Sequence, residues 1–150
     1  MIARPTETLS ELYEKDETAW LDAMAELVQF GQRESLDLPN LHDYLTSMAN
    51  RDRKEVFHRM VQLMMHLLKW HFQPEKRGNT WSASIRFQRE ELNWDCNAGT
   101  LRNYAKSTLD VAYEKARIEA AYQSGLPREA FPEQLGMTLD ELLADTELPE

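Results

Sequence analysis

The sequence of 150 residues has little cysteine, little glycine and no long apolar run. Its single cysteine, Cys96, has no second cysteine in the chain to pair with, which excludes an internal disulfide framework. No basic segment followed by an apolar one opens the sequence, so we expect a reducing, cytoplasmic location. The longest apolar-rich run, residues 60–72, is shorter than the ~20 residues that a membrane span needs and contains His66 and Lys69. These absences predict a soluble protein that does not enter a membrane.

The common motifs of catalysis and ligand binding are missing as well. The sequence has no P-loop, GxGxxG, GxSxG, HExxH, paired CxxC or DxDxDG calcium loop. Glu55-x-x-His58 is a single pair of the kind that di-iron bundles use twice. We therefore expect no metal and no cofactor, and we favour a non-enzymatic role.

Acidic residues outnumber basic ones, but unevenly along the chain. The net charge is −9; residues 1–50 hold ten acids and three bases, whereas residues 51–106 hold six acids and eleven bases. One interpretation is that the acidic ends pack near the basic middle and neutralise part of it. The alternative is a basic surface that docks an acidic protein or nucleic acid. The candidates for that surface are Arg51, Arg53, Lys54, Lys76, Arg77, Arg86 and Arg89, with Arg102 beside them.

Apolar periodicity predicts helices throughout and no sheet. Asp16 is placed to cap a helix that ends at Gly31, and Thr138 with Glu141 forms a capping box for a short last helix. Between them we expect a short helix that ends near Asn50, followed by a central helix over 52–73 that is capped by Asp52 and Glu55. Two further helices are expected after it. The first is capped by Asn79 or Thr80, and the second runs from Thr100 to Ser124 and stops at Gly125. The predicted fold class is all-α, an irregular bundle of about four main helices with short accessory helices. We expect a single domain over residues 1–150, with 1–15 and 145–150 frayed or loosely packed.

The central helix is apolar on most sides in its second half, yet one stripe of it is polar. After Glu55 that stripe continues at steps of three or four residues, which places its members on one helix face: Arg59, Gln62, His66, Lys69 and Gln73. A functional interpretation makes Lys69 a base or carbonyl nucleophile beside His66. The structural interpretation, which we favour, has His66 hydrogen-bonded and Lys69 paired with an acid from another helix.

The order of several motifs resembles a known family. The motifs are Tyr13-x-x-Asp16-x-x-x-Trp20, then Leu36-Asp37-Leu38 with Asn40-Leu41, His66-Leu67-Leu68-Lys69-Trp70 with Gln73-Pro74, Trp81 with Ile85, and Phe131-Pro132-Glu133 before Thr138-Leu139-x-x-Leu142-Leu143. In this order the chain is similar to the bacterial domain-of-unknown-function family 29. The resemblance implies a small, all-helical, bacterial, cytoplasmic protein, and it implies no activity. The chain departs from the family pattern before the central helix, where Ala49 and Asn50 replace a glycine and a serine cap.

Together the composition and the motifs favour a helical protein-protein interaction or adaptor module. Its partner is expected to be another protein, a second copy of the chain included. One alternative is a regulator or antitoxin-like protein that contacts nucleic acid through the basic central region. A second alternative is an enzyme or metal-binding protein centred on His66 and Lys69.

Overall fold

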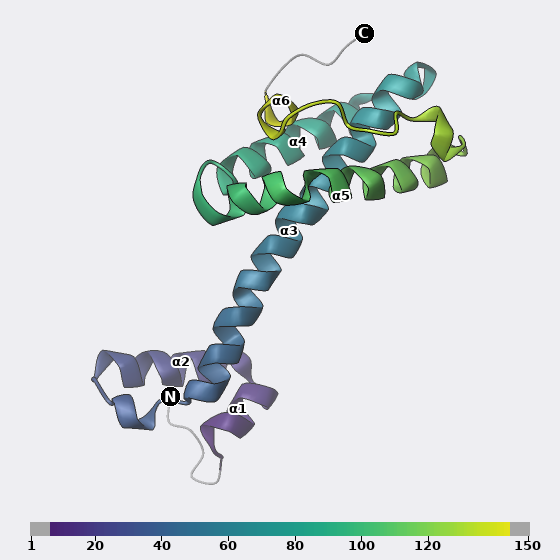
Figure 1. Ribbon diagram of the computed structural model, residues 1–150. Coiled ribbons are helices and arrows are strands. Elements are labelled where there is room, and N and C mark those ends of the chain that lie inside the picture. The colour runs from purple at the N-terminus through teal and green to yellow at the C-terminus, as the bar shows by residue number, and fades with distance from the viewer. Residues whose placement is uncertain (1–6, 145–150) are drawn as a thin grey trace. The chain divides into compact units, whose positions relative to one another are not determined.

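The computed structural model describes residues 7–144, and this part of the chain is helical without a strand (Figure 1). Its helices are α1 (Leu9–Lys15), α2 (Glu17–Gln29), α3 (Leu38–Phe72), α4 (Asn79–Asp95), α5 (Gly99–Ser124) and α6 (Leu139–Leu143), with 3-10 turns η1 (Arg33–Ser35), η2 (Pro74–Lys76) and η3 (Arg128–Ala130). The predicted all-α fold class is therefore confirmed. The chain divides into two compact units, Met1–Asn50 and Arg51–Glu150. That the two units make one folding domain stays a prediction.

The first unit contains α1, α2, η1 and the beginning of α3. Its core is small, with Leu12, Ala19, Trp20 and Met24 buried. The Trp20 indole is fully buried, and its Nε1 donates a hydrogen bond to Asp37 Oδ2 at 3.1 Å. The predicted cap of α2 is confirmed, because the Asp16 side chain accepts from the amide of Ala19. Of the segments predicted to be frayed or loosely packed, 1–15 and 145–150, residues 1–6 and 145–150 lie outside the described range. The rest of the first segment contains α1, whose Leu12 is buried.

Helix α3 contradicts the predicted break near Asn50. It runs without interruption for 35 residues from Leu38 to Phe72, so Asp52 and Glu55 lie inside a helix and cap nothing. The sequence between Pro39 and Pro74 contains neither glycine nor proline, and an asparagine inside a helix costs only about 0.7 kcal/mol relative to alanine. Pro39 falls in the first turn, where its missing N–H is tolerated.

The second unit packs α4, α5 and α6 against the C-terminal half of α3. Its core contains large side chains from α3 and α4 opposite small ones from α5: Met60, Leu63, Met64, Ile85 and Leu92 against Ala105, Ala112, Ala116 and Ala120. Buried alanines let a helix approach its neighbours closely. Gly125 ends α5 in the left-handed conformation (φ 75°), as predicted. The caps predicted for α4 and α5 are wrong, because these helices start one or two residues earlier, after Gly78 and Ala98, without a side-chain cap.

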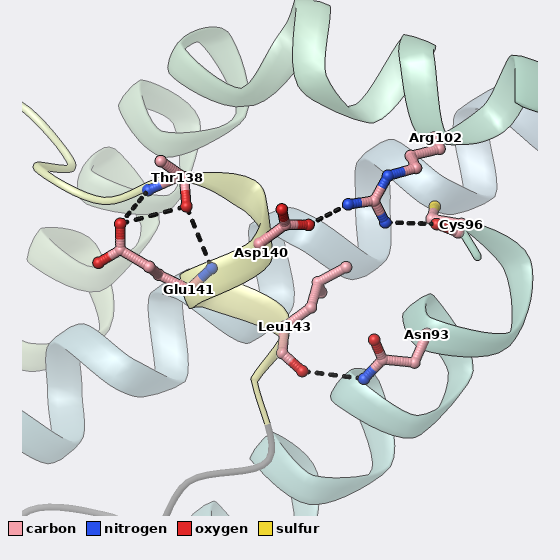
Figure 2. Close-up of polar contacts among 7 residues, drawn as sticks. All are labelled: Asn93, Cys96, Arg102, Thr138, Asp140, Glu141 and Leu143. Atoms are coloured by element: carbon pink, nitrogen blue, oxygen red, sulfur yellow. Dashed lines mark hydrogen bonds and ion pairs between the residues drawn. The ribbon is translucent and has the colours of Figure 1, made fainter. Parts of the chain in front are cut away.

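Helix α6 has five residues and is held by polar contacts from α4 and α5 as well as by its buried leucines. Figure 2 shows the predicted capping box between Thr138 and Glu141, the ion pair of Arg102 with Asp140, and the bond from Asn93 Nδ2 to the carbonyl of Leu143 at 2.9 Å. An isolated helix of this length would not be stable in water, so these contacts fix its position.

Along the described part of the chain, no helix combines the length and the apolar character that crossing a membrane requires.

Candidate functional site

The residues of the predicted polar stripe differ in their surroundings. Arg59 and Lys69 contact other helices of the second unit, His66 bonds the carbonyl of Gln62 within α3, and Gln73 is buried just after α3 ends.

At the N-terminal end of the stripe, Arg59 pairs with Glu55 (2.8 Å) and donates from Nη1 to Gln88 Oε1 on α4 (3.1 Å). The guanidinium also lies 5.4 Å from the ring centroid of Phe87, in cation–π range. Its Nε is buried without a hydrogen-bond partner. Arg59 thus belongs to the contact between α3 and α4.

Lys69 is a nearly buried cation, with 8% of its surface exposed. Its Nζ donates to Gln123 Oε1 on α5 at 2.8 Å and lies 4.9 Å from the ring centroid of Trp81 on α4. Among residues 7–144 no carboxylate lies within ion-pair distance of it, so the predicted acidic partner is wrong and a neutral amide takes its place. Burial lowers the pKa of Lys69 below the ordinary value of 10.5.

His66 lies one turn before Lys69 and is half-buried. Its Nδ1 is 2.8 Å from the carbonyl oxygen of Gln62. A carbonyl only accepts, so Nδ1 carries a proton and the neutral ring keeps its lone pair on Nε2. Burial lowers the pKa of His66 from 6.5, and the positive charge of Lys69 lowers it further, while the bond to Gln62 acts in the opposite direction. In the described part of the chain, His, Cys, Asp and Glu side chains form no group of three that could hold a metal ion.

The predicted basic surface is not gathered in one place. Arg51 and Lys54 lie at one end of the second unit's part of α3, while Lys76 follows its other end, ~30 Å away along the helix axis. Arg77 lies between exposed and buried, with its guanidinium 5.1 Å from the ring centroid of Trp70 and its Nε bonded to the carbonyl of Trp70. Arg53 is partly exposed.

Two of the arginines stabilise the fold instead of forming a surface. Arg89 is buried, contrary to the surface position that the sequence predicts, and its Nε donates to the carbonyl of Leu142 at 3.1 Å. Arg102 bonds the carbonyl of Cys96 at 3.0 Å in addition to its ion pair with Asp140 (Figure 2). Both arginines hold α6 in place. Of the two arginines of α4 that the sequence assigns to the basic surface, only Arg86 is exposed, and it pairs with Glu90 at 3.0 Å.

The most exposed aromatic surface of the second unit outside α5 lies on α4, and it was not predicted from the sequence. Trp94 is 80% exposed and Phe87, two turns earlier, is 51% exposed. Beside them are two hollows of about 410 and 350 Å³ that share Arg86 and Glu90 as lining residues. We name this surface the outer face of α4; it consists of Asn79, Ser82, Ala83, Arg86, Phe87, Glu90, Asn93, Trp94 and Asn97. The signal in the sequence is the seven-residue spacing of Phe87 and Trp94, out of phase with the buried pair Ile85 and Leu92.

A separate apolar cavity of about 340 Å³ lies in the same unit, lined mainly by α3, by Tyr113 of α5 and by residues 132–137. Leu67 and Leu68 of α3 line it, but the neighbouring His66 and Lys69 do not. The hydroxyl of Tyr113 donates to the carbonyl of Pro132 at 2.6 Å, which fixes one wall. The lining is thus mostly apolar and contains no member of the polar stripe, although His71, Arg89 and Glu141 also border the cavity.

Comparison with known proteins gives one match. Neither a curated protein nor a solved structure matches the chain. The family described as "Domain of unknown function DUF29" matches residues 12–147, which is most of the sequence, as the motifs beginning at Tyr13 and ending at Leu143 predict. The chain therefore belongs to the DUF29 family.

Proposed function

We propose that this chain is a non-enzymatic protein-association module. The side chains best suited to chemistry are engaged inside the second unit: Lys69 by Gln123 and Trp81, and His66 by Gln62. Two large aromatic side chains of α4, Phe87 and Trp94, are by contrast exposed. This distribution supports a protein that works through its surface.

The observation that carries the proposal is the exposure of Trp94 beside Phe87 on the outer face of α4. Tryptophan is enriched among the residues that dominate binding energy at protein interfaces, and each Å² of apolar surface buried contributes about 25 cal/mol. Arg86 and Glu90 lie on the same face, so the face presents both charges. A partner for this face is expected to be a protein surface with an apolar centre and mixed charge.

The distribution of basic residues supports a protein partner over nucleic acid. Nucleic-acid affinity depends on several cations that reach neighbouring phosphates together. Here Arg51 and Lys54 lie ~30 Å along α3 from Lys76, and Arg89 is buried. The outer face of α4 carries one exposed arginine already paired with an acid.

Site-specific photo-crosslinking in living cells tests the proposal. A photoreactive amino acid replaces Trp94 in the full chain, and the matched control replaces Lys106, an exposed polar position on α5. We expect position 94 to form a defined crosslink to protein and position 106 to form none. Absence of a protein crosslink at position 94, combined with nucleic acid that co-purifies and is lost in the Arg51→Glu/Lys54→Glu variant, would contradict the association function.

A further inference from the structure

We propose that the outer face of α4 binds a second copy of this chain, with the two α4 helices antiparallel about a two-fold axis near residues 88 and 89. This inference rests on the association function proposed above and names its partner.

The face carries both a projecting group and a space that can receive it. Trp94 projects into solvent, and the hollow of about 410 Å³ is bordered by the small, exposed Ala83 and by Phe87. Positions 83 and 94 have their midpoint between residues 88 and 89. An antiparallel pair centred there places Trp94 of each copy opposite Ala83 of the other, and the symmetry repeats this contact on both sides of the axis.

A two-fold axis at the same position also brings oppositely charged residues of the two copies together. Arg86 and Glu90 are exposed, and their midpoint is residue 88. In the antiparallel arrangement Arg86 of one copy therefore faces Glu90 of the other. An exposed ion pair within one helix contributes little to stability, but across an interface such pairs select the register and the partner.

The edges of the helix agree with this register. Phe87 and Trp94 are two turns apart, and Ala83 is one turn before Phe87, so all three lie along one edge of the face. A two-fold axis perpendicular to both helices brings the same edge of each copy together. Trp94 then meets Phe87 of the other copy as well as Ala83, which gives the aromatic contact a favourable geometry.

The interface is small. Helix α4 has 17 residues, which corresponds to ~25 Å, so a pairing through this face falls at the low end of specific interfaces. We expect a dissociation constant on the order of micromolar.

Sedimentation velocity over a concentration series of the full chain tests the pairing. The wild type is expected to sediment as a dimer at high concentration. Trp94→Ser, Arg86→Glu and Glu90→Arg should each weaken dimerisation at least about tenfold, because each removes a contact made twice. All three positions are exposed, so circular dichroism should report an unchanged fold.

A charge exchange makes the test specific for the register. An equimolar mixture of the Arg86→Glu and Glu90→Arg chains should form a heterodimer, since residues 86 and 90 of one chain are then acidic and those of the other basic. The double variant Arg86→Glu/Glu90→Arg should recover the homodimer. The matched control is Tyr122→Ser, which removes a still more exposed aromatic residue (86%) on α5 and should leave the dimer intact.

Three outcomes would overturn the inference: a wild type that is monomeric throughout the series, a dimer that survives Trp94→Ser and Arg86→Glu, or a charge exchange that restores nothing. The photo-crosslink at position 94 distinguishes failure of this inference from failure of the proposed association function. A monomer that is crosslinked to a different protein refutes the second copy and keeps the association function, whereas a monomer without any crosslink refutes both.

Discussion

Lys69 shows how one buried charge is accommodated without an acid. Its ammonium has the amide oxygen of Gln123 and the ring of Trp81 as partners. We expect Gln123→Leu to lower the free energy of unfolding by about 1–3 kcal/mol, because it leaves a buried cation without its acceptor. Lys69→Met, which removes the charge and keeps the length of the side chain, should change stability by less than about 1 kcal/mol. Urea unfolding measures both.

The double variant provides the control for this pair. Once Lys69 is methionine, Gln123→Leu should cost little, because no ammonium remains to be satisfied. An equal cost of Gln123→Leu in both backgrounds would show that Gln123 acts independently of Lys69.

His66 should make stability depend on pH. Because its pKa in the folded chain is lower than the ordinary value of 6.5, the unfolded chain takes up a proton first as the pH falls. Protonation then favours unfolding, so the contribution of His66 is fully present above about pH 6.5 and is lost toward lower pH. His66→Asn should therefore lose less stability than the wild type between neutral and mildly acidic pH, measured by thermal unfolding. A His66→Asn variant that loses stability as much as the wild type over this range would contradict the prediction.

Side chains with local partners were predicted in part: two helix caps were correct, whereas those expected for α3, α4 and α5 were wrong. The caps at Asp16 and Thr138 join residues three apart and were both correctly predicted. The role of Arg89 was not, because its acceptor is 53 residues away on α6. Gln123 is likewise 54 residues away from Lys69 in the sequence. No local pattern shows that the acceptor for Lys69 is an amide and not a carboxylate.

At the scale of the element, α3 shows how a local signal can mislead. Asp52 and Glu55 have the spacing of a capping box, but the same spacing also occurs inside helices, and only a breaker would have separated the two cases. From Leu45 to Glu55 no residue of α3 is buried. This segment therefore depends on helix propensity more than on packing.

Ala49→Gly tests that dependence. Glycine costs about 0.8–1.0 kcal/mol relative to alanine in an exposed helix, so amide hydrogen exchange over residues 46–54 should accelerate about fivefold. Amides near the buried Leu63 should keep their wild-type rates. Unchanged exchange at 46–54 would mean that packing, not propensity, maintains this part of α3.

The buried and the cavity-lining leucines of α3 should differ in their contribution. Leu63 is fully buried, whereas Leu67 is partly exposed and lines the apolar cavity. Leu63→Ala should cost about 2–5 kcal/mol, and Leu67→Ala less, because the cavity already leaves it with fewer contacts. Chemical denaturation compares them directly. A larger cost at Leu67 would show that the cavity is closed in solution.

At the scale of the whole molecule, the sequence predicts the fold class and the family but not the division into two units. Apolar periodicity reports which helices have buried faces, and it does not report which faces pack together. Within residues 7–144, the buried apolar residues fall into two clusters without a common member, a small one around Trp20 and a large one around Leu63. Likewise, the basic residues in the middle of the sequence suggested one surface, but Arg51 and Lys54 lie ~30 Å along α3 from Lys76.

Trp20→Ala decides whether residues 1–150 unfold as the single domain that the sequence predicts. Truncating this fully buried side chain should cost about 3–5 kcal/mol, a large share of what a core of four buried residues can supply. Because the two clusters share no buried residue, we expect hydrogen exchange to become fast in α1 and α2 while amides near Leu63, Ile85 and Ala112 stay protected. Equal acceleration in both units would instead establish one cooperative domain, with α3 transmitting the loss from the first unit to the second.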